Sequence, residues 1–236
     1  MDGVESIKGN RMTPVIVNVF NRLTTTRKLC EQLAERGCRP IILDNASTWQ
    51  PLLEWYADCP FEVIRLPNNI GHHAPWISGA VDNLRSPFYC VTDCDLDLDG
   101  VPVDLMAVLQ EPLTWRRMLG VVKSGVALRI NDLPPWQSQV REWESRFWKT
   151  PLGGPYYAAP IDTTLAMYRA NTPVRVACRV AGVRAVRAGG PYTARHVPWY
   201  LNLNKLDEEN RNYFATANSS NSWRPNGDKL TSRFCG

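Results

Sequence analysis

The sequence contains no run of about 18 apolar residues, the length that a membrane-spanning helix requires. Residues 1–12 are polar and have no apolar segment of the kind that signal peptides carry. The seven cysteines are scattered and form no Cys-x-x-Cys pair, which favours free thiols over a disulfide framework. These absences predict a cytoplasmic protein. They leave open a peripheral contact with the inner face of a membrane through basic or Trp-rich patches.

Acidic residues are missing from 163–206, while this stretch contains Arg169, Arg175, Arg179, Arg184, Arg187 and Arg195. Three interpretations stay open: a grip on a donor diphosphate, a face for an anionic acceptor such as a lipid-linked phosphate, or a solvated basic surface. Aromatic side chains are not interleaved with the arginines as base stacking would require, and the net charge is only +4. We therefore expect no nucleic-acid partner.

Four apolar, β-rich runs are present, at 14–20, 39–45, 61–67 and 87–93. Helical patterns separate them at 24–37, 48–59 and 75–85, the first with threonines at its start and Gly37 after its end. This order predicts an α/β fold with a mostly parallel central sheet and helices on both faces. Ligands bind such sheets at the carboxyl ends of the strands, where this sequence is polar.

The second half is less regular and rich in proline and tryptophan. A helix is predicted from about 137, a strand at 159–169 and a terminal helix from 207. We divide the chain into an N-terminal tail (1–12), a first half (13–100), a second half of the same domain (101–215) and a C-terminal tail or lid (216–236). Tryptophans in irregular segments indicate either a binding groove or core and surface packing; they are Trp76, Trp115, Trp136, Trp143, Trp148 and Trp199.

Residues 92–100 read TDCDLDLDG, a dense acidic cluster that needs a counterion. The start of a calcium loop is matched from Asp95, but position twelve of that loop, which requires Glu, is Met106. The pair Asp93-x-Asp95 at a strand end instead suits Mg²⁺ or Mn²⁺, which keep coordination positions open for substrate phosphates. Asp97 and Asp99 are expected to lie beyond the site.

Four polar motifs lie at or after the ends of the four predicted strands, in this order: NVFNR (18–22), LDNAS (43–47), NNIG (68–71) and TDCD (92–95). Together they resemble the nucleotide-sugar glycosyltransferases of the family 2 type, which have the GT-A fold. The resemblance covers about 13–100 and is weaker in the second half. It implies a nucleoside-diphosphate sugar donor and a divalent cation, Mn²⁺ or Mg²⁺. It also implies that 13–100 is the nucleotide-sugar-binding half and 101–215 the acceptor-binding half of the same domain.

The resemblance also implies roles for individual residues. Asn18, Phe20 and Arg22 would flank the nucleotide base, and Asp44 would bond to the base or ribose, with a turn or helix cap as its alternative role. Asn69 and Gly71 would let the backbone approach the nucleoside. Asp93 would contact ribose or metal, and Asp95 would ligate the metal. His196 would complete the metal shell, or is an ordinary core or surface histidine.

A catalytic base is harder to select. Family 2 enzymes usually present an acidic pair in the acceptor half, and this sequence shows none there before Asp207-Glu208-Glu209, which is predicted to begin the terminal helix. Asp162, in AAPIDTT, is our candidate for deprotonating the acceptor hydroxyl. Its alternative role is structural, paired with Thr163 or Thr164. Glu142 and Glu144 are further candidates.

The sequence thus predicts a metal-dependent glycosyltransferase of polysaccharide biosynthesis. It would move a sugar from a UDP-linked donor to a hydroxyl of a saccharide or glycolipid acceptor, with inversion. Two alternatives remain. A sugar-phosphate nucleotidylyltransferase is disfavoured because no Gly-rich loop follows the first strand. A non-catalytic nucleotide-sugar-binding protein would keep the same pocket.

Overall fold

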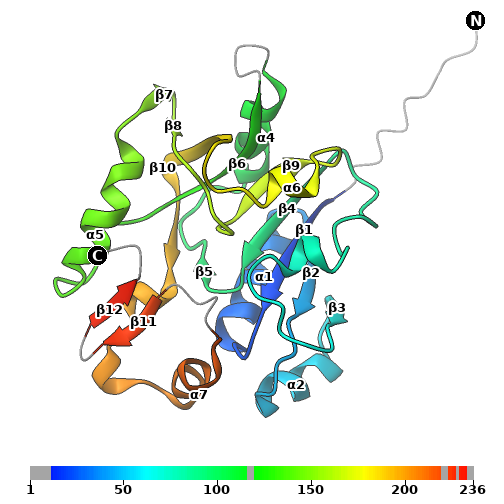
Figure 1. Ribbon diagram of the computed structural model, residues 1–236, viewed down its shortest axis with the longest axis vertical. Coiled ribbons are helices and arrows are strands. Elements are labelled where there is room, and N and C mark those ends of the chain that lie inside the picture. The colour runs from blue at the N-terminus through cyan, green and yellow to red at the C-terminus, as the bar shows by residue number, and fades with distance from the viewer. Residues whose placement is uncertain (1–11, 116–119, 219–222, 227–228, 233–236) are drawn as a thin grey trace, which may run out of the picture.

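The structure is a computed structural model that describes residues 12–115, 120–218, 223–226 and 229–232 (Figure 1). Of the predicted N-terminal tail, only Met12 lies within the described residues. The first half alternates strands and helices as predicted: β1 (Thr13–Val19), α1 (Thr24–Glu35), β2 (Cys38–Asp44), α2 (Gln50–Ala57), β3 (Glu62–Arg65), α3 (Ala74–Ile77) and β4 (Phe88–Asp93).

The second half adds shorter elements around two long strands. They are β5 (Leu96–Asp97), α4 (Leu105–Thr114), β6 (Val121–Leu128), α5 (Ser138–Ser145), η2 (Arg146–Trp148), β7 (Pro151–Gly153), β8 (Tyr156–Ala158), β9 (Ala166–Arg169), α6 (Val174–Ala177), β10 (Arg184–His196), η3 (Val197–Tyr200), η4 (Leu203–Lys205) and α7 (Glu208–Thr216). In the stretch predicted as a tail or lid, β11 (Trp223–Asn226) and β12 (Lys229–Ser232) pair as a separate two-stranded sheet.

The central sheet has the strand order β3-β2-β1-β4-β9-β6-β10-β8-β7, with β5 paired to β10. Strands β3, β2, β1 and β4 are parallel neighbours, as are β6 and β10. Strand β9 lies antiparallel between β4 and β6. The predicted α/β class with a mostly parallel sheet is confirmed. The carboxyl ends of β1, β2 and β4 therefore meet at one edge.

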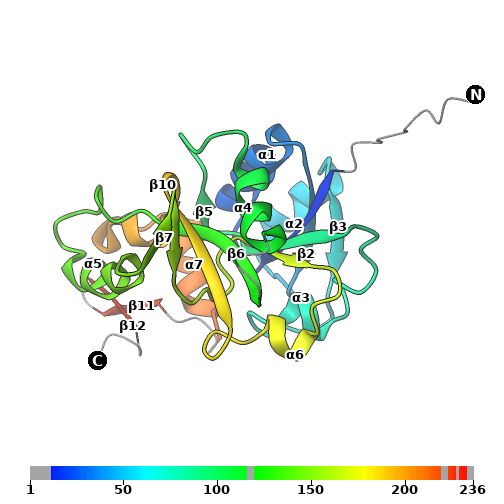
Figure 2. The same cartoon turned by 90° about the horizontal axis from the view of Figure 1, so that it is seen from above.

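Helices cover both faces of the sheet. The side chains of alternate residues in a strand point to opposite faces, and both faces of this sheet carry apolar side chains that pack against helices. Val15, Val17 and Val19 of β1 pack with apolar residues of α1, α2 and α4. Ile16 packs on the other face with residues of α3 and α6. Figure 2 shows α1 and α4 on one side of the sheet and α3 and α6 on the other. Within the described residues, every helix is too short or too polar to cross a membrane.

Three predicted details are wrong. The helix predicted at 75–85 ends as α3 at Ile77, because Gly79 takes the left-handed backbone conformation, with φ of 77°. The strand predicted at 159–169 begins only at Ala166. No threonine caps α1: its N-cap residue is Leu23, and the Thr26 hydroxyl donates back to the carbonyl of Arg22.

Candidate active site at the carboxyl edge of the sheet

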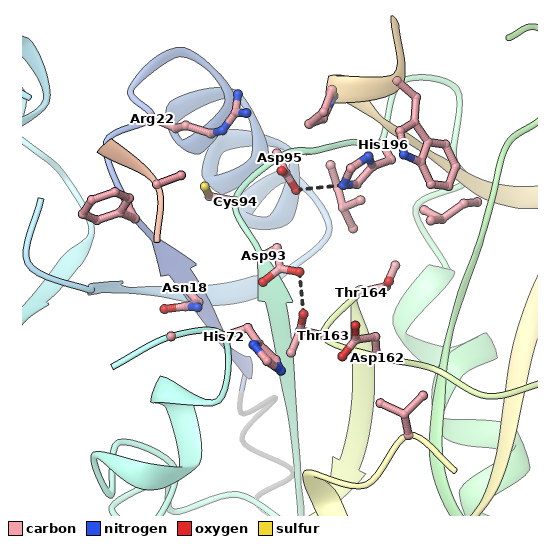
Figure 3. A pocket seen from close by; sticks show the side chains of 18 of the residues that line it. Asn18, Arg22, His72, Asp93, Cys94, Asp95, Asp162, Thr163, Thr164 and His196 are labelled. Carbon is pink, nitrogen blue, oxygen red and sulfur yellow. Dashed lines mark hydrogen bonds and ion pairs between the residues drawn. The ribbon is translucent and has the colours of Figure 1, made fainter. Parts of the chain in front are cut away.

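A cavity of about 530 Å³ opens at the carboxyl ends of β1 and β4 (Figure 3). Its walls come from both halves of the chain. Of the residues that the sequence singled out for a site, those lining the cavity are Asn18, Phe20, Arg22, Asn69, Gly71, Asp93, Asp95, Asp162 and His196. Asp44 is not among the lining residues. The structure thus brings together nine of these ten residues, and of the two further candidates for the base, Glu144 lines the cavity and Glu142 does not.

Asp93 ends β4 beside Asn18 of β1, because these two residues are register partners in the parallel pair. The Thr163 hydroxyl donates to Asp93 Oδ2 at 2.6 Å. Burial, followed by the charge of Asp95, raises the pKa of Asp93 well above its usual range, while the Thr163 hydrogen bond opposes the shift. The carboxyl groups of Asp93 and Asp95 repel each other when both are ionised, which favours a positive charge between or beside them. The Asn18 Oδ1 atom is buried and has no hydrogen-bond partner among the described residues.

His196 ends β10 and lies beside Asp95 because of the antiparallel pairing of β10 with β5. In that pairing His196 is opposite Leu96, and the Val197 N–H donates to the Asp95 carbonyl at 2.9 Å. The His196 Nε2 atom is 3.6 Å from Asp95 Oδ1, which is too long for a hydrogen bond. Burial lowers the pKa of His196 and so favours the neutral imidazole.

Asp95 and His196 fit a divalent cation. Asp95 Oδ1 is buried and lacks a hydrogen-bond partner within the described part of the chain, so a lone pair is available there. A neutral imidazole beside a carboxylate is a common ligand pair for divalent metals. The described residues contain no cluster of three or more His, Cys, Asp or Glu side chains able to hold a metal alone. Further ligands would have to come from substrate oxygens or water, which is usual for Mg²⁺ in phosphate sites.

The turn at 69–71 is held in place by Asn45, a residue that the sequence analysis did not assign to the site. The Asn45 amide donates to the Gly71 carbonyl at 2.9 Å and accepts from the Ile70 N–H at 2.8 Å. The Asn69 side chain accepts from the Gly71 N–H at 3.0 Å. Gly71 has a φ of 86°, which only glycine adopts readily, so the turn can pass close to a ligand. Asn45 belongs to the LDNAS motif, so its position directly after the second strand is the sequence signal that could have assigned it to the site.

Asp44 is buried at the end of β2, and its carboxylate has protein partners on both oxygens. Oδ1 accepts from the Ser47 N–H at 3.2 Å and from the Tyr56 hydroxyl at 3.3 Å. Oδ2 accepts from Arg65 Nε at 3.1 Å. This is the turn role that the sequence offered as the alternative. Contact of Asp44 with a base or ribose stays a prediction.

Arg22 is buried beneath α7. Its Nη1 donates to Asn210 Oδ1 at 3.0 Å, and its guanidinium lies 3.7 Å from the centre of the Tyr213 ring. Tyr213 and Phe214 of α7 also line the cavity, as does Asn218. Helix α7 therefore forms one wall of the cavity. The sequence analysis recognised this helix but gave it no place in the site.

Asp162 is exposed and has no hydrogen-bond or ion-pair partner among the described residues. Its proposed structural partner Thr163 donates to Asp93 instead. Glu144, on α5, is buried and pairs with Arg187 at 2.5 Å. Burial raises the pKa of Glu144 to about 7, against the opposing effect of Arg187. Both carboxyl groups line the cavity, whereas Glu142 does not.

Three further aromatic rings line the cavity. Trp143 and Phe147 come from α5 and η2, and Trp199 from η3. Two of the six singled-out tryptophans thus lie in the cavity. Trp76 instead belongs to the core, where its indole N–H donates to the Tyr89 hydroxyl at 3.2 Å. Trp199 also belongs to the main buried core, and the groove interpretation stays a prediction for Trp143 and Trp199.

Asp97 and Asp99 lie outside the cavity, as predicted. Asp97 accepts from Gln32 at 2.9 Å, and Lys28 pairs with Asp97 at 3.0 Å and with Asp99 at 2.5 Å. Gly100 then turns the chain with a φ of 75°. The acidic cluster is therefore divided: its first two aspartates face the cavity, and its last two tie the chain to α1.

Comparison with known proteins gives similarity only to solved structures; no protein family and no curated protein matches the sequence. A crystal structure of GalNAc-T7 with UDP, GalNAc and Mn²⁺ has a TM-score of 0.48 and 13% sequence identity, over 78% of this chain and 43% of that one. S. aureus TarS 1–349 has a TM-score of 0.40 and 17% identity, over 67% of this chain and 47% of that one. Its complex with UDP has a TM-score of 0.38. The chain spans less than half the length of these structures.

Proposed function

We propose that the chain is a glycosyltransferase of the family 2 type with the GT-A fold. It takes a sugar from a nucleoside-diphosphate donor, UDP-linked, and transfers it to a hydroxyl of a saccharide or glycolipid acceptor. One observation carries the proposal: Asp93 and Asp95, at the end of β4, share a single cavity with Asn18, His196 and Asp162. Substrate binding at the carboxyl ends of strands is the general behaviour of open α/β sheets.

The donor would lie between the ends of β1 and β4. Phe20 offers an aromatic surface for the base, and the 69–71 turn lets the backbone approach the nucleoside. Asp95 and His196 would hold Mn²⁺ or Mg²⁺, and Asp93 would contact the ribose or the cation. When bound, the cation would neutralise the charge that develops on the leaving diphosphate.

Asp162 would act as the base. Its carboxylate takes the proton of the acceptor hydroxyl while that oxygen forms a bond to the anomeric carbon. The bond from that carbon to the diphosphate breaks, and its electron pair leaves with the diphosphate. Attack from the side opposite the leaving group inverts the anomeric configuration. The exposure of Asp162 and its lack of a partner among the described residues support this role.

The test measures UDP affinity by calorimetry with Mn²⁺ present, and UDP release from UDP-sugars. We expect UDP binding by the unchanged protein and at least about tenfold weaker binding by Asp95→Asn. Asp99→Asn is the matched control, because Asp99 belongs to the same acidic cluster but pairs with Lys28 outside the cavity. Its affinity should equal that of the unchanged protein.

Failure of the unchanged protein to bind UDP, with either Mn²⁺ or Mg²⁺, would overturn the proposal. Tight, Asp95-dependent UDP binding without turnover of any UDP-sugar would favour the non-catalytic binding protein. Equal losses in Asp95→Asn and Asp99→Asn would show that the acidic cluster acts through general charge and not through a metal site.

A further inference from the structure

A second cavity, of about 520 Å³, adjoins the proposed active site. This volume lies within the range of about 300–1,000 Å³ that is typical of small-molecule sites. Its lining is mainly aliphatic and includes Leu152, Ala159, Pro160, Val180, Val183 and Val186. The proposed donor chemistry uses none of these side chains. A site for nucleotide or sugar would offer polar groups, so this cavity suits an apolar ligand.

The two cavities share a wall. Pro160 and Val180 line both of them. On the active-site side, Arg187 Nε donates to the Pro160 carbonyl at 2.8 Å. On the other side, Arg184 lines the second cavity. A ligand that occupied both cavities would therefore pass Pro160 and Val180, with Arg187 lining one cavity and Arg184 the other.

The rim of the second cavity combines exposed apolar and basic groups. The side chains of Leu152 and Val180 are among the large apolar residues that the described chain leaves in solvent, at 40% and 39% exposure. Arg184, which lines the cavity, is also exposed, and it belongs to the segment 163–206, which contains no acidic residue. This combination favours a ligand with an aliphatic part and a negative charge.

We propose that the second cavity binds the aliphatic tail of the acceptor, and that the acceptor is an amphiphile with a phosphate group held near Arg184 and Arg187. The role of this ligand as acceptor rests on the proposed function. The tail would remove apolar surface from water along Leu152 and Val180. The head would extend past Pro160 toward Asp162.

The experiment measures binding of monomeric alkyl phosphates, below their micelle concentrations and without donor. Octyl phosphate and butyl phosphate share the head and differ by four methylenes. Each fully buried methylene is worth about threefold to fourfold in affinity, so we expect octyl phosphate to bind at least about tenfold more tightly. Octyltrimethylammonium, with the same tail and the opposite charge, should bind more weakly than octyl phosphate.

Leu152→Asp should abolish the advantage of the octyl chain, because it places a charge in the apolar wall. Leu152 is exposed and lines only the second cavity, so folding and UDP affinity should be unchanged. Val103→Asp is the matched control, since Val103 is 73% exposed and lines neither cavity. It should bind both phosphates as the unchanged protein does.

Equal affinity for butyl and octyl phosphate would overturn the inference, as would an octyl advantage that survives Leu152→Asp. A dimer that Leu152→Asp dissociates and Val103→Asp preserves would show that a second copy covers the cavity instead. UDP titration of the same samples separates the two proposals. A tail effect without UDP binding supports the lipid site and overturns the donor site, and UDP binding without a tail effect does the reverse.

Discussion

Asp93 and Thr163 are joined by two hydrogen bonds. The Thr163 hydroxyl donates to Asp93 Oδ2 at 2.6 Å, and the Asp93 N–H donates to the Thr163 carbonyl at 3.1 Å. These bonds connect the end of β4 to the segment before β9, which also carries Asp162. The spacing between the proposed donor-binding carboxylate and the proposed base is therefore fixed by one residue pair and not by a flexible loop.

Thr163→Val should destabilise the protein by about 0.5–1.5 kcal/mol, because valine keeps the shape of threonine but removes the hydrogen bond to the half-buried Asp93 carboxyl group. Urea unfolding measures this free energy. Thr163→Ser is the matched control, since it restores the hydroxyl, and it should recover most of the loss. Equal losses in the two variants would mean that the methyl group, and not the hydrogen bond, matters here.

Asp162→Asn should lower the rate of sugar transfer at least about 100-fold while UDP affinity stays within about twofold. The amide has the size of the carboxylate but cannot take a proton. Steady-state kinetics and UDP calorimetry measure the two effects. Glu142→Gln, an exposed carboxylate outside the cavity, should leave both unchanged. Normal turnover by Asp162→Asn would exclude it as the base and direct attention to Glu144.

The first half of the fold could be predicted because its signals are local. Each of the strands β1 to β4 is a short apolar run, and turn or capping residues separate it from the next helix. Gly37 shows how local the signal is: it follows α1, has a φ of 69° and donates its N–H to the Ala34 carbonyl. The length of α3 was misjudged, since its end depends on the single residue Gly79, and so was the threonine cap of α1.

Strands β6 and β10 of the second half could not be predicted, because their residue types suit them only in the folded sheet. β10 reads RAVRAGGPYTARH, with arginines and a Gly-Gly-Pro break inside a strand. Buried Arg187 is tolerated there because Glu144, 43 residues away in sequence, pairs with it. Lys123 is likewise buried in β6, where its Nζ donates to the Ile161 carbonyl at 3.1 Å. Local sequence patterns cannot show that a buried charged side chain has a partner so far away in the sequence.

The same distinction applies to the site. Asp93, Asp95 and the 69–71 turn are recognisable because they directly follow strands. The contribution of α7 was missed because Asn210 is 188 residues from Arg22 in sequence. The roles of Glu144 and Trp143 likewise depend on how α5 packs over the cavity, which no spacing in the sequence specifies.

Arg22→Lys should destabilise the protein by about 1–3 kcal/mol. Lysine keeps the charge but loses the planar contact with Tyr213 and the hydrogen bond to Asn210 in a buried place. Urea unfolding is again the measurement. Arg27→Lys is the control: Arg27 is 61% exposed and pairs only with Glu31 among the described residues, so its change should stay below about 0.5 kcal/mol. Equal effects at the two positions would contradict the proposed attachment of α7 through Arg22.

Glu144 should make stability fall as the pH rises from about 4.5 to about 7. Burial raises its pKa from 4.5 to about 7, although Arg187 opposes the shift. The folded state therefore holds this proton more tightly than the unfolded state, and between these pH values unfolding releases it. The effect is at most about 3 kcal/mol and is complete above about pH 7.

Glu144→Gln should lack this slope, and Glu142→Gln should retain it. Urea unfolding across pH 4–8 gives the free energy of unfolding of the unchanged protein minus that of each variant. The contributions of other titrating groups cancel in this difference, which should fall with pH for Glu144→Gln and stay flat for Glu142→Gln. A flat or rising difference for Glu144→Gln would show that Arg187 keeps this carboxylate ionised throughout.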